Sequence, residues 1–406
     1  MKRRDLIKGL SVLPFAGGII GGVIPFETVK AAPPDSKRDL FKELGIRTFI
    51  NAAGTLTFMT GSLMHDYVLE TINATSKDFC LLDEVQDKVG ERIATLVHSE
   101  AAVVTAGAFS GLTLGLAGVL AGMDQKKVEQ LPHLEGSGMK SEVICQKAHD
   151  IVYNHAFRNT GCTIVSVETV EELEKAINEK TALLSFINIQ ADKGKIMHEE
   201  WVAIGKKHNI PTAIDIAADV PPVSNLWKFN DMGFSFVVIS GGKAIRGPQS
   251  AGLLMGKKEI IAAARLHMPP RGFNIGRGMK VNKEEILGMY VALERYIAQD
   301  HDKEWKEWEK GISIIENTVK PLIGVTTKIF VPPLGNITPT LSISWDPTKV
   351  KISAKDLQEK LRKGDPSIEV GGGDDNNINV TVWVMKPGQD KIVARRLKEE
   401  LSMASG

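Results

Sequence analysis

Short apolar runs alternate with segments of helical periodicity between about residue 84 and residue 255, and this alternation constrains the fold more than any other feature. The apolar runs are continuous, as is typical of strands buried on both faces. Such strands, separated by helices, form a mostly parallel sheet with helices on both sides, so we expect an α/β fold. The predicted strands are 101–105, 142–146, 163–168, 182–187, 211–215, 236–240 and 251–255, and the first predicted helices are 83–97 and 107–122.

The pattern changes after Lys280. Two long helical segments, 283–298 and 302–319, lead to short strands at 341–345 and 378–384 and to a last helix near 388–402. This order predicts a smaller α+β domain. We therefore divide the chain into an export signal (1–31), an N-terminal arm (32–80), a large domain (81–280) and a small C-terminal domain (281–406).

The composition excludes several classes of function. The chain has 406 residues, of which 43% are hydrophobic and 24% are charged, and its net charge is +1. A nucleic-acid surface would need a clustered basic excess, so we expect no nucleic-acid partner. Three cysteines do not make a disulfide framework, and no cysteine or histidine spacing is typical of a zinc site. We expect no metal.

The N-terminus has the pattern of a secretory signal. A basic start is followed by a Gly-rich apolar stretch and by Val29-Lys30-Ala31, where small or apolar residues suit cleavage. The pair Arg3-Arg4 resembles a twin-arginine export signal. An uncleaved membrane anchor is the alternative, although glycines and Pro25 interrupt the apolar stretch. We expect a periplasmic protein with no stable membrane insertion after cleavage.

Lys243 stands in a glycine-lined turn, "SGGKAIRGPQS", between two strands that are predicted to be buried. A buried ammonium group is costly unless it is paired or neutral, and a Schiff base to a carbonyl cofactor is one use for such a lysine. The alternative is a lysine whose head reaches out to solvent. Ser240, at the end of the preceding strand, lies close to it in sequence.

Asp215 ends the predicted strand 211–215, 28 residues before Lys243. In a parallel sheet both residues then lie at the carboxyl ends of strands, where open α/β sheets bind ligands. A carboxylate there can keep a pyridine nitrogen protonated. A helix N-cap is the alternative role. Asp219 is a second carboxylate nearby, but Asp215 directly follows the strand and is preferred.

The stretch "VVTAGAFSGL" (103–112) reads as a strand, a tight turn and a helix start. Gly107, Ala108 and Phe109 would offer backbone N–H groups to an anion at the helix N-terminus, and Ser110 could add a hydroxyl. The alternative is that the glycines serve close packing of helix on sheet, and both can hold. The lysine-containing nucleotide loop is absent from the sequence.

His149 follows the predicted strand 142–146, where an imidazole could stack on a cofactor ring and move a proton. A surface or core histidine is the alternative. Tyr153, His155 and Arg158 are further polar candidates in the same stretch.

Six segments together resemble the fold-type I pyridoxal-phosphate enzymes of the selenocysteine-synthase-like branch, on the side of the D-glucosaminate-6-phosphate ammonia-lyases. The Ser-Gly-Gly-Lys-x-x-x-Gly-Pro-Gln element is the most specific of them. The segments are "INAAGTLTFMTGS", "AAVVTAGAFSGLTLGLAGVLAG", "QKAHDIVYNHAFRNTG", "PTAIDIAADVPP", "DMGFSFVVISGGKAIRGPQSAGLLMGKKEII" and "IGRGMKVNKEEILGMYVALERYI".

The resemblance implies a homodimer or larger assembly, a small-molecule amine substrate and bound pyridoxal 5'-phosphate. It assigns Lys243 as the Schiff-base lysine, Asp215 as the partner of the ring nitrogen and His149 as the ring-stacking residue. Other assignments concern groups around these three: Gly107, Ala108 and Ser240 near the phosphate, and Arg246 and Arg277 as basic residues near the site.

One departure concerns the substrate. Many relatives have an arginine, suited to a substrate carboxylate, where this chain has Gly371. The resemblance favours an ammonia-lyase-like α,β-elimination on an amino acid or amino sugar acid. Two alternatives are a selenium transferase, which the export signal disfavours because tRNA is cytoplasmic, and an inactive relic that only binds a ligand.

Overall fold

The computed structural model describes residues 38–405, which form two units. The described part of the first unit, up to Thr48, contains the short helix α2 (Leu40–Glu43), with an ion pair between Arg38 and Glu43. The second unit begins at Phe49 and contains every other element. The predicted export signal, 1–31, lies outside the described residues.

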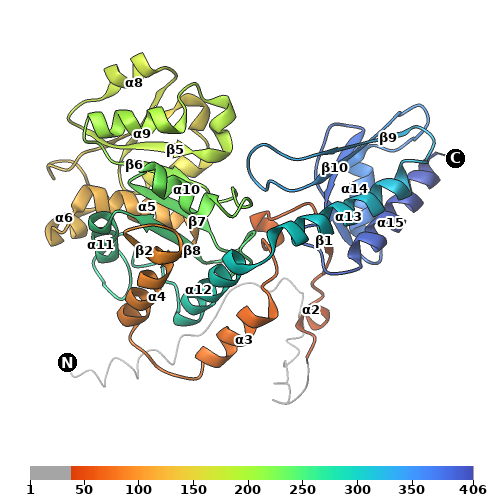
Figure 1. The fold of residues 1–406 in the computed structure, drawn as a ribbon, viewed down its shortest axis with the longest axis horizontal. Helices are drawn as coiled ribbons and strands as arrows, with labels where there is room; N and C mark the ends of the chain where they lie inside the picture. Colours follow the sequence, from red (N-terminus) through yellow and green to blue (C-terminus); the bar gives the residue numbers. More distant parts are fainter. Residues whose placement is uncertain (1–37, 406) are drawn as a thin grey trace, which may run out of the picture. The chain divides into compact units, whose positions relative to one another are not determined.

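A seven-stranded sheet flanked by helices forms one lobe of the second unit (Figure 1). Its strand order is β2-β8-β7-β6-β5-β3-β4, and only β8 runs antiparallel to its neighbours. The mostly parallel sheet that the sequence predicts is confirmed. The strands are β2 (Ala101–Thr105), β3 (Glu142–Gln146), β4 (Thr163–Val167), β5 (Thr181–Ile187), β6 (Thr212–Asp215), β7 (Phe236–Ser240) and β8 (Gly252–Gly256).

Two apolar cores cover the two faces of this sheet, because successive strand residues point to opposite sides. In β7, Val237 and Ile239 belong to one core, and Phe236 and Val238 belong to the other. The first core takes its helical side chains from α4 (Leu82–Leu96), α9 (His198–Lys207), α10 (Asn225–Met232) and α12 (Lys283–Ala298). The second takes them from α5 (Gly107–Ala121), α6 (Gln125–Gln130), α7 (His155–Arg158) and α11 (Lys258–Leu266).

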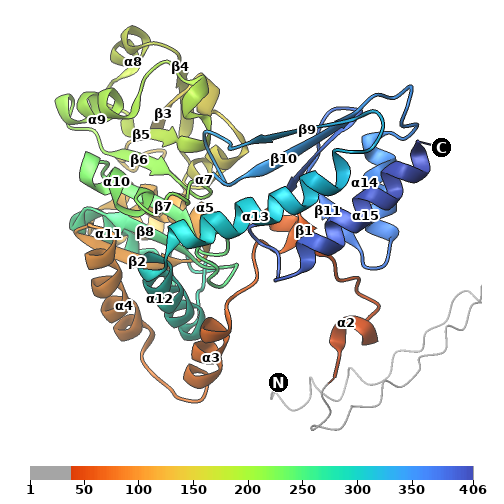
Figure 2. The same ribbon diagram turned by 45° about the vertical axis from the view of Figure 1, so that its right-hand side comes forward.

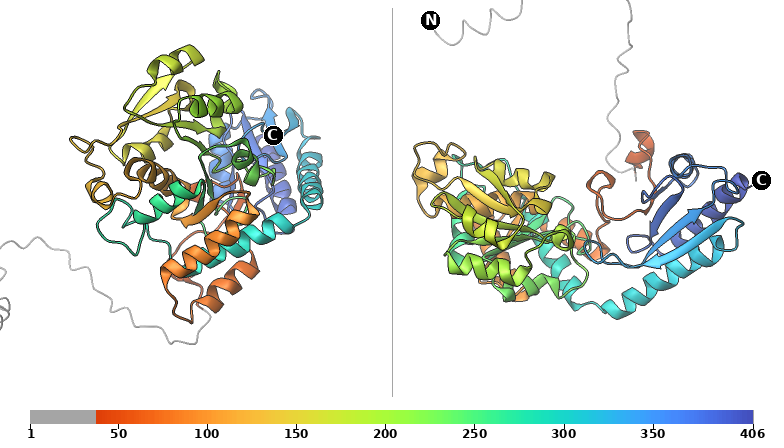
Figure 3. Two further views of the ribbon diagram at one scale, coloured as in Figure 1. Left: turned by 60° about the vertical axis from the view of Figure 1, so that its left-hand side comes forward. Right: turned by 90° about the horizontal axis from the view of Figure 1, so that it is seen from above.

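A third core belongs to the C-terminal residues and to one strand from the N-terminal arm (Figures 2 and 3). The antiparallel sheet β12-β10-β9 lies with the pair β1-β11, in which Ile50 is opposite Ile368. The elements are β1 (Ile50–Ala52), α13 (His301–Val319), β9 (Val325–Phe330), β10 (Thr340–Trp345), α14 (Ala354–Lys363), β11 (Ile368–Val370), β12 (Asn377–Thr381) and α15 (Gln389–Ala404).

The sequence missed several elements and placed others well. The helices α3 (Asp66–Thr75), α14 and the strands β1 and β9 were not predicted, and the last strand ends at Thr381, before the predicted 384. The chain passes from the core of the large sheet to the C-terminal core between α12 and α13. The proposed domain limits remain predictions.

Residues 38–405 contain neither a membrane-spanning helix nor a cluster of metal-ligating side chains. None of the helices there has the length and apolarity needed to cross a membrane. The same residues contain no group of three or more His, Cys, Asp or Glu side chains placed to hold a metal ion.

Candidate active site

The ends of three strands meet at one edge of the large sheet. β6 and β7 are parallel neighbours, so their carboxyl ends lie together. β8 begins at Gly252, which pairs with the last residue of β2 on one side and of β7 on the other. The turns after β2, β6 and β7 therefore surround one place, and they carry Gly107, Asp215 and Lys243.

The turn that carries Lys243 is held by a segment about 180 residues earlier. The hydroxyl of Ser62 donates to the carbonyl oxygens of Lys243, at 2.6 Å, and of Gly242, at 3.0 Å. Burial lowers the pKa of Lys243, while the carboxyls of Asp215 and Asp219 act to raise it. A lysine with a lowered pKa is neutral more often than one in water, and it can then act as a nucleophile or base.

Two buried carboxyl groups face this lysine. Oδ1 of Asp215 accepts the N–H of Ala217 at 2.8 Å, and burial raises the pKa of Asp215 against the opposing charge of Lys243. Oδ1 of Asp219 accepts the N–H of Gly335 at 3.1 Å, and burial raises the pKa of Asp219 to about 6. Asp219 is thus tied to the C-terminal residues, whereas Asp215 is bonded only to its own turn among residues 38–405.

The head of α5 is suited to an anion. Gly107 begins this 15-residue helix with φ of +82°, and no side chain caps its first turn. The backbone N–H groups there carry the partial positive charge of the helix N-terminus. The other role considered for the glycines also holds, because a Cβ on Gly115 would lie 2.7 Å from the ring of Phe236. The glycines therefore also permit close packing of α5 on the sheet.

Known proteins resemble this chain in sequence and in fold. The Aminotransferase class-V family matches residues 147–275. A D-glucosaminate-6-phosphate ammonia lyase of Salmonella typhimurium is 26% identical over 81% of this chain and 88% of its own length. A structure of D-glucosaminate-6-phosphate ammonia-lyase has a TM-score of 0.80 at 24% identity, over 91% of this chain and all of that one.

The chain has the fold of the fold-type I pyridoxal-phosphate enzymes. Its relatives carry out different reactions. A 5'-C-glycyluridine monooxygenase-decarboxylase of Streptomyces is 26% identical over 89% of this chain and 92% of its own. An L-seryl-tRNA(Sec) selenium transferase of Mannheimia succiniciproducens is 26% identical over 59% of this chain and 51% of its own.

The residues of this pyridoxal-phosphate enzyme fit the cofactor. Asp215 would hold the ring nitrogen and Lys243 the aldehyde carbon, and the head of α5 would hold the phosphate. A Cβ on Gly252 would lie 2.6 Å from the carbonyl carbon of Gly107 and 2.7 Å from the nitrogen of Ala108. Glycine at 252 thus lets β8 approach the phosphate turn closely. Phe109 and Ser110 follow in the first turn of α5, and Ser240 ends β7 beside Gly252.

His149, which was predicted to stack on the cofactor ring, is fully buried. Its exposed fraction is 0%, its Nδ1 accepts the N–H of Ile187 at 3.2 Å, and its ring edge meets Phe186. Burial lowers its pKa to about 4, so the imidazole is neutral. The stacking role of His149 stays a prediction.

The other predicted residues are spread around the pyridoxal-phosphate enzyme. Arg246 lies in the lysine turn, where its N–H donates to the carbonyl oxygen of Lys243 at 3.1 Å. Tyr153 and Arg277 are exposed. Arg158 pairs with Asp150 at 3.5 Å. The geometry therefore brings Arg246 to Lys243 and gives no such contact for Tyr153, Arg158 or Arg277.

Ser62 ends one of the segments that carry the family resemblance, but its bond to the lysine turn and the contacts of Asn188 were not predicted. Ser62 holds the lysine turn, as described above. Asn188 contacts Asp219, and its Oδ1 lies 2.7 Å from Nε2 of His198. These residues come from different elements, so no local pattern could have grouped them. Only Asn188 directly follows a strand, β5, and that position is the signal that could have found it.

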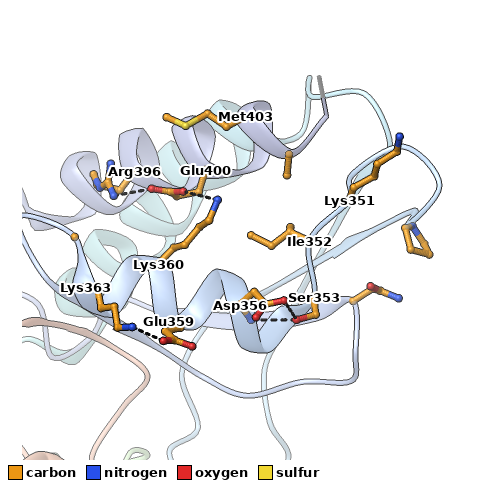
Figure 4. A pocket seen from close by; sticks show the side chains of 14 residues that line it. Lys351, Ile352, Ser353, Asp356, Glu359, Lys360, Lys363, Arg396, Glu400 and Met403 are labelled. Atoms are coloured by element: carbon orange, nitrogen blue, oxygen red, sulfur yellow. Dashed lines mark hydrogen bonds and ion pairs between the residues drawn. The ribbon is translucent and has the colours of Figure 1, made fainter.

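One cavity is lined by C-terminal residues and not by the lysine turn. It measures about 1070 Å³ and is formed by α14, α15 and the residues before α14 (Figure 4). Its charged side chains pair with one another, as in the contacts of Arg396 with Glu400 at 2.8 Å and of Lys363 with Glu359 at 2.5 Å. Neutralised charges in an open surface hollow make it a poor candidate for the site.

A smaller cavity of about 210 Å³ adjoins the lysine site through Gly335, which donates to Asp219. Asn336, also in its wall, donates its N–H to the carbonyl oxygen of Ala218 at 2.7 Å. We call it the neutral cavity, because none of its lining residues is charged. They are Ala53, Gly54, Phe330, Pro332, Gly335, Asn336, Thr338, Thr340, Asn379, Val380, Thr381 and Trp383.

Proposed function

We propose that the chain is an exported lyase that removes a β-substituent from an amino acid or amino sugar acid by α,β-elimination. One observation carries the proposal: Lys243, Asp215 and the uncapped head of α5 come together at one edge of the sheet. The relative of Salmonella typhimurium that covers most of the chain is an ammonia lyase, which supports elimination.

The residues have distinct tasks in such a reaction. Bound pyridoxal phosphate supplies an electron sink that makes the substrate's Cα–H acidic. Nζ of Lys243, whose pKa is lowered by burial, removes that proton as a general base. Asp215 holds the proton on the ring nitrogen, and Ser62 fixes the lysine turn.

A spectroscopic and a chemical measurement test this function. The purified protein should absorb visible light, and Lys243→Ala should abolish that band. A panel of D- and L-amino acids and amino sugar acids should include one that releases ammonia and a keto acid. Colourless protein that refuses added cofactor would refute the assignment.

The same panel separates the alternatives. Release of CO₂ with uptake of O₂ would instead favour the chemistry named for the Streptomyces relative. Cofactor binding with no turnover of any amine would favour a ligand-binding relic. Binding of seryl-tRNA by cytoplasmic protein would favour selenium transfer.

We also propose a homodimer or larger assembly. Large apolar side chains are exposed on the second unit, among them Phe58, Phe79, Leu81 and Phe273. Exposed apolar groups of this size are typical of surfaces that bind another chain. Phe79→Asp should therefore shift the molar mass measured by light scattering toward that of the monomer.

Export is a further proposal, and it rests on residues 1–31 of the sequence. Replacing Arg3 and Arg4 by lysine should retain the protein in the cytoplasm, because the twin-arginine pair is a receptor-read signal. Cell fractionation of the full chain would show this. Equal periplasmic amounts of both forms would contradict the twin-arginine route.

A further inference from the structure

Arg246 has a backbone conformation that arginine rarely adopts. Its φ is +55°, in the left-handed region that glycine enters without strain. The residue lies three positions after Lys243, and its N–H bonds to the lysine's carbonyl oxygen. An outlier of this kind persists where the surrounding structure or a function holds it in place. The contacts of its side chain indicate what role it has.

The guanidinium of Arg246 is short of partners. Its Nε is buried with no hydrogen bond, and its Nη2 reaches only the carbonyl oxygen of Val384, at 3.5 Å. No carboxylate lies within 4.0 Å of it among residues 38–405. Burial lowers its pKa, with Glu304 and Tyr67 acting from a distance to raise it. A guanidinium has five N–H donors, so most of its bonding capacity is unused.

The neutral cavity lies close to this arginine along the chain. Trp383 lines the cavity and is the residue before Val384, whose carbonyl Arg246 meets. The cavity is also connected to Asp219 through Gly335, and the carboxyl of Asp219 interacts electrostatically with Lys243. A substrate held between Arg246 and Lys243 would therefore extend into this cavity.

The cavity itself offers hydroxyl and amide groups but no charge. Thr340, Thr381 and Asn379 line it beside the aromatic Trp383. Gly371 bridges to Asn379 and contributes no side chain. A dianionic phosphate in such a place would be desolvated with no cation to pair with. A cavity of about 210 Å³ has room for a chain of several heavy atoms.

We propose that Arg246 binds the single carboxylate of the amine substrate and that the neutral cavity receives an uncharged, hydroxylated tail. The substrate class is then a hydroxylated amino acid or amino sugar acid without a phosphate group. This inference rests on the proposed function. It assigns the carboxylate to a side chain of the lysine turn and not to the position of Gly371.

Equilibrium binding to the holoenzyme tests the proposal without turnover. The probes are serine and D-glucosaminate, each compared with its analogue lacking the carboxylate (ethanolamine and glucosamine), and D-glucosaminate 6-phosphate. Wild-type protein should bind each carboxylate probe about 10- to 100-fold more tightly than the analogue that lacks the carboxylate, since a bidentate charged pair contributes an affinity of that size. The phosphate ester should bind more weakly than D-glucosaminate.

Arg246→Gly should erase the carboxylate preference while leaving the affinity for the analogues unchanged. Because glycine relaxes the left-handed backbone, the thermal midpoint of Arg246→Gly should equal or exceed that of the wild type. Arg246→Lys should recover part of the preference. Arg395→Gln, which removes an exposed arginine of α15, is the matched control and should bind as the wild type does.

The outcomes separate this inference from the function it rests on. A wild-type carboxylate preference that survives in Arg246→Gly would overturn the role of Arg246, with the proposed function intact. Tighter binding of the 6-phosphate would overturn the neutral tail. A lower midpoint with lost cofactor would make Arg246 structural. A coloured protein that binds no amine would overturn both proposals.

Discussion

Replacing Gly252 by alanine tests the phosphate turn at its tightest point. The added Cβ would lie 2.6 Å from the carbonyl carbon of Gly107, and 2.7 Å from both the nitrogen of Ala108 and the carbonyl oxygen of Ile239. All three are backbone atoms, and strand pairing to β2 and β7 fixes Gly252 on both sides. No flexible side chain can move aside to relieve the contact.

The expected magnitude follows from these distances. An ordinary contact needs at least about 3.4 Å, so the head of α5 or the strand must move by about 0.7–0.8 Å. Overpacking of this kind costs ~1–3 kcal/mol of folding stability. The same movement stretches a bond from about 2.9 to about 3.7 Å, beyond hydrogen-bond range. Each charge-assisted bond lost to the phosphate costs ~1.5–3 kcal/mol, or at least about tenfold in affinity.

Two measurements check this prediction. Urea unfolding should show the loss of stability, and titration of cofactor-free protein with pyridoxal phosphate, followed by absorbance, should show at least about a tenfold weaker affinity. Gly272→Ala is the matched control, because a Cβ there meets no atom within 4 Å. If Gly252→Ala retained wild-type affinity and stability, the head of α5 would not be the phosphate site.

Three further predictions concern Asp219, Ser62 and the cysteines. The raised pKa of Asp219 favours its protonated carboxyl in the folded protein, so this group stabilises the fold below pH ~4 and the stabilisation is lost as the pH rises through about 6. The free energy of unfolding of the cofactor-free protein, measured with urea, should fall by ~3 kcal/mol over that window. The fall should be smaller in Asp219→Asn. Ser62→Ala should loosen the lysine turn and lower kcat several-fold while urea unfolding shows a loss of ~1 kcal/mol. Thiol titration of native protein at pH 8 should detect Cys80 alone, because Cys145 and Cys162 are buried and their pKa values are raised to about 12 and about 11; three reactive thiols would contradict that burial.

The sequence predicts those parts of the site that follow a strand directly. Asp215 and the lysine turn come at the ends of apolar runs, and a parallel sheet gathers such ends at one edge. The hydrogen bond of Ser62 could not be predicted, because it joins the lysine turn to a segment 180 residues away through a backbone carbonyl. Burial is equally non-local: the position of His149 after a strand did not reveal that its ring packs at a steep angle against Phe186.

The strand β1 was missed for the same physical reason. Three residues give no periodicity to recognise, and their partner strand, β11, begins at Ile368. The helices α3 and α14 are short and follow polar segments. The long helices α12 and α13 were predicted because several turns repeat the same apolar spacing.

The pairing of β1 with β11 has a consequence for how the chain can be made. Ile50 emerges from the ribosome more than 300 residues before its partner Ile368. The ladder that anchors the segment leading to Ser62 can form only after residues 368–370 have been synthesised, so the contact of Ser62 with the lysine turn is secured late in folding. A nascent or truncated chain that ends before β11 would contain Lys243, Asp215 and Gly107. It would still lack the β1–β11 pairing that anchors the segment from which Ser62 contacts the lysine turn.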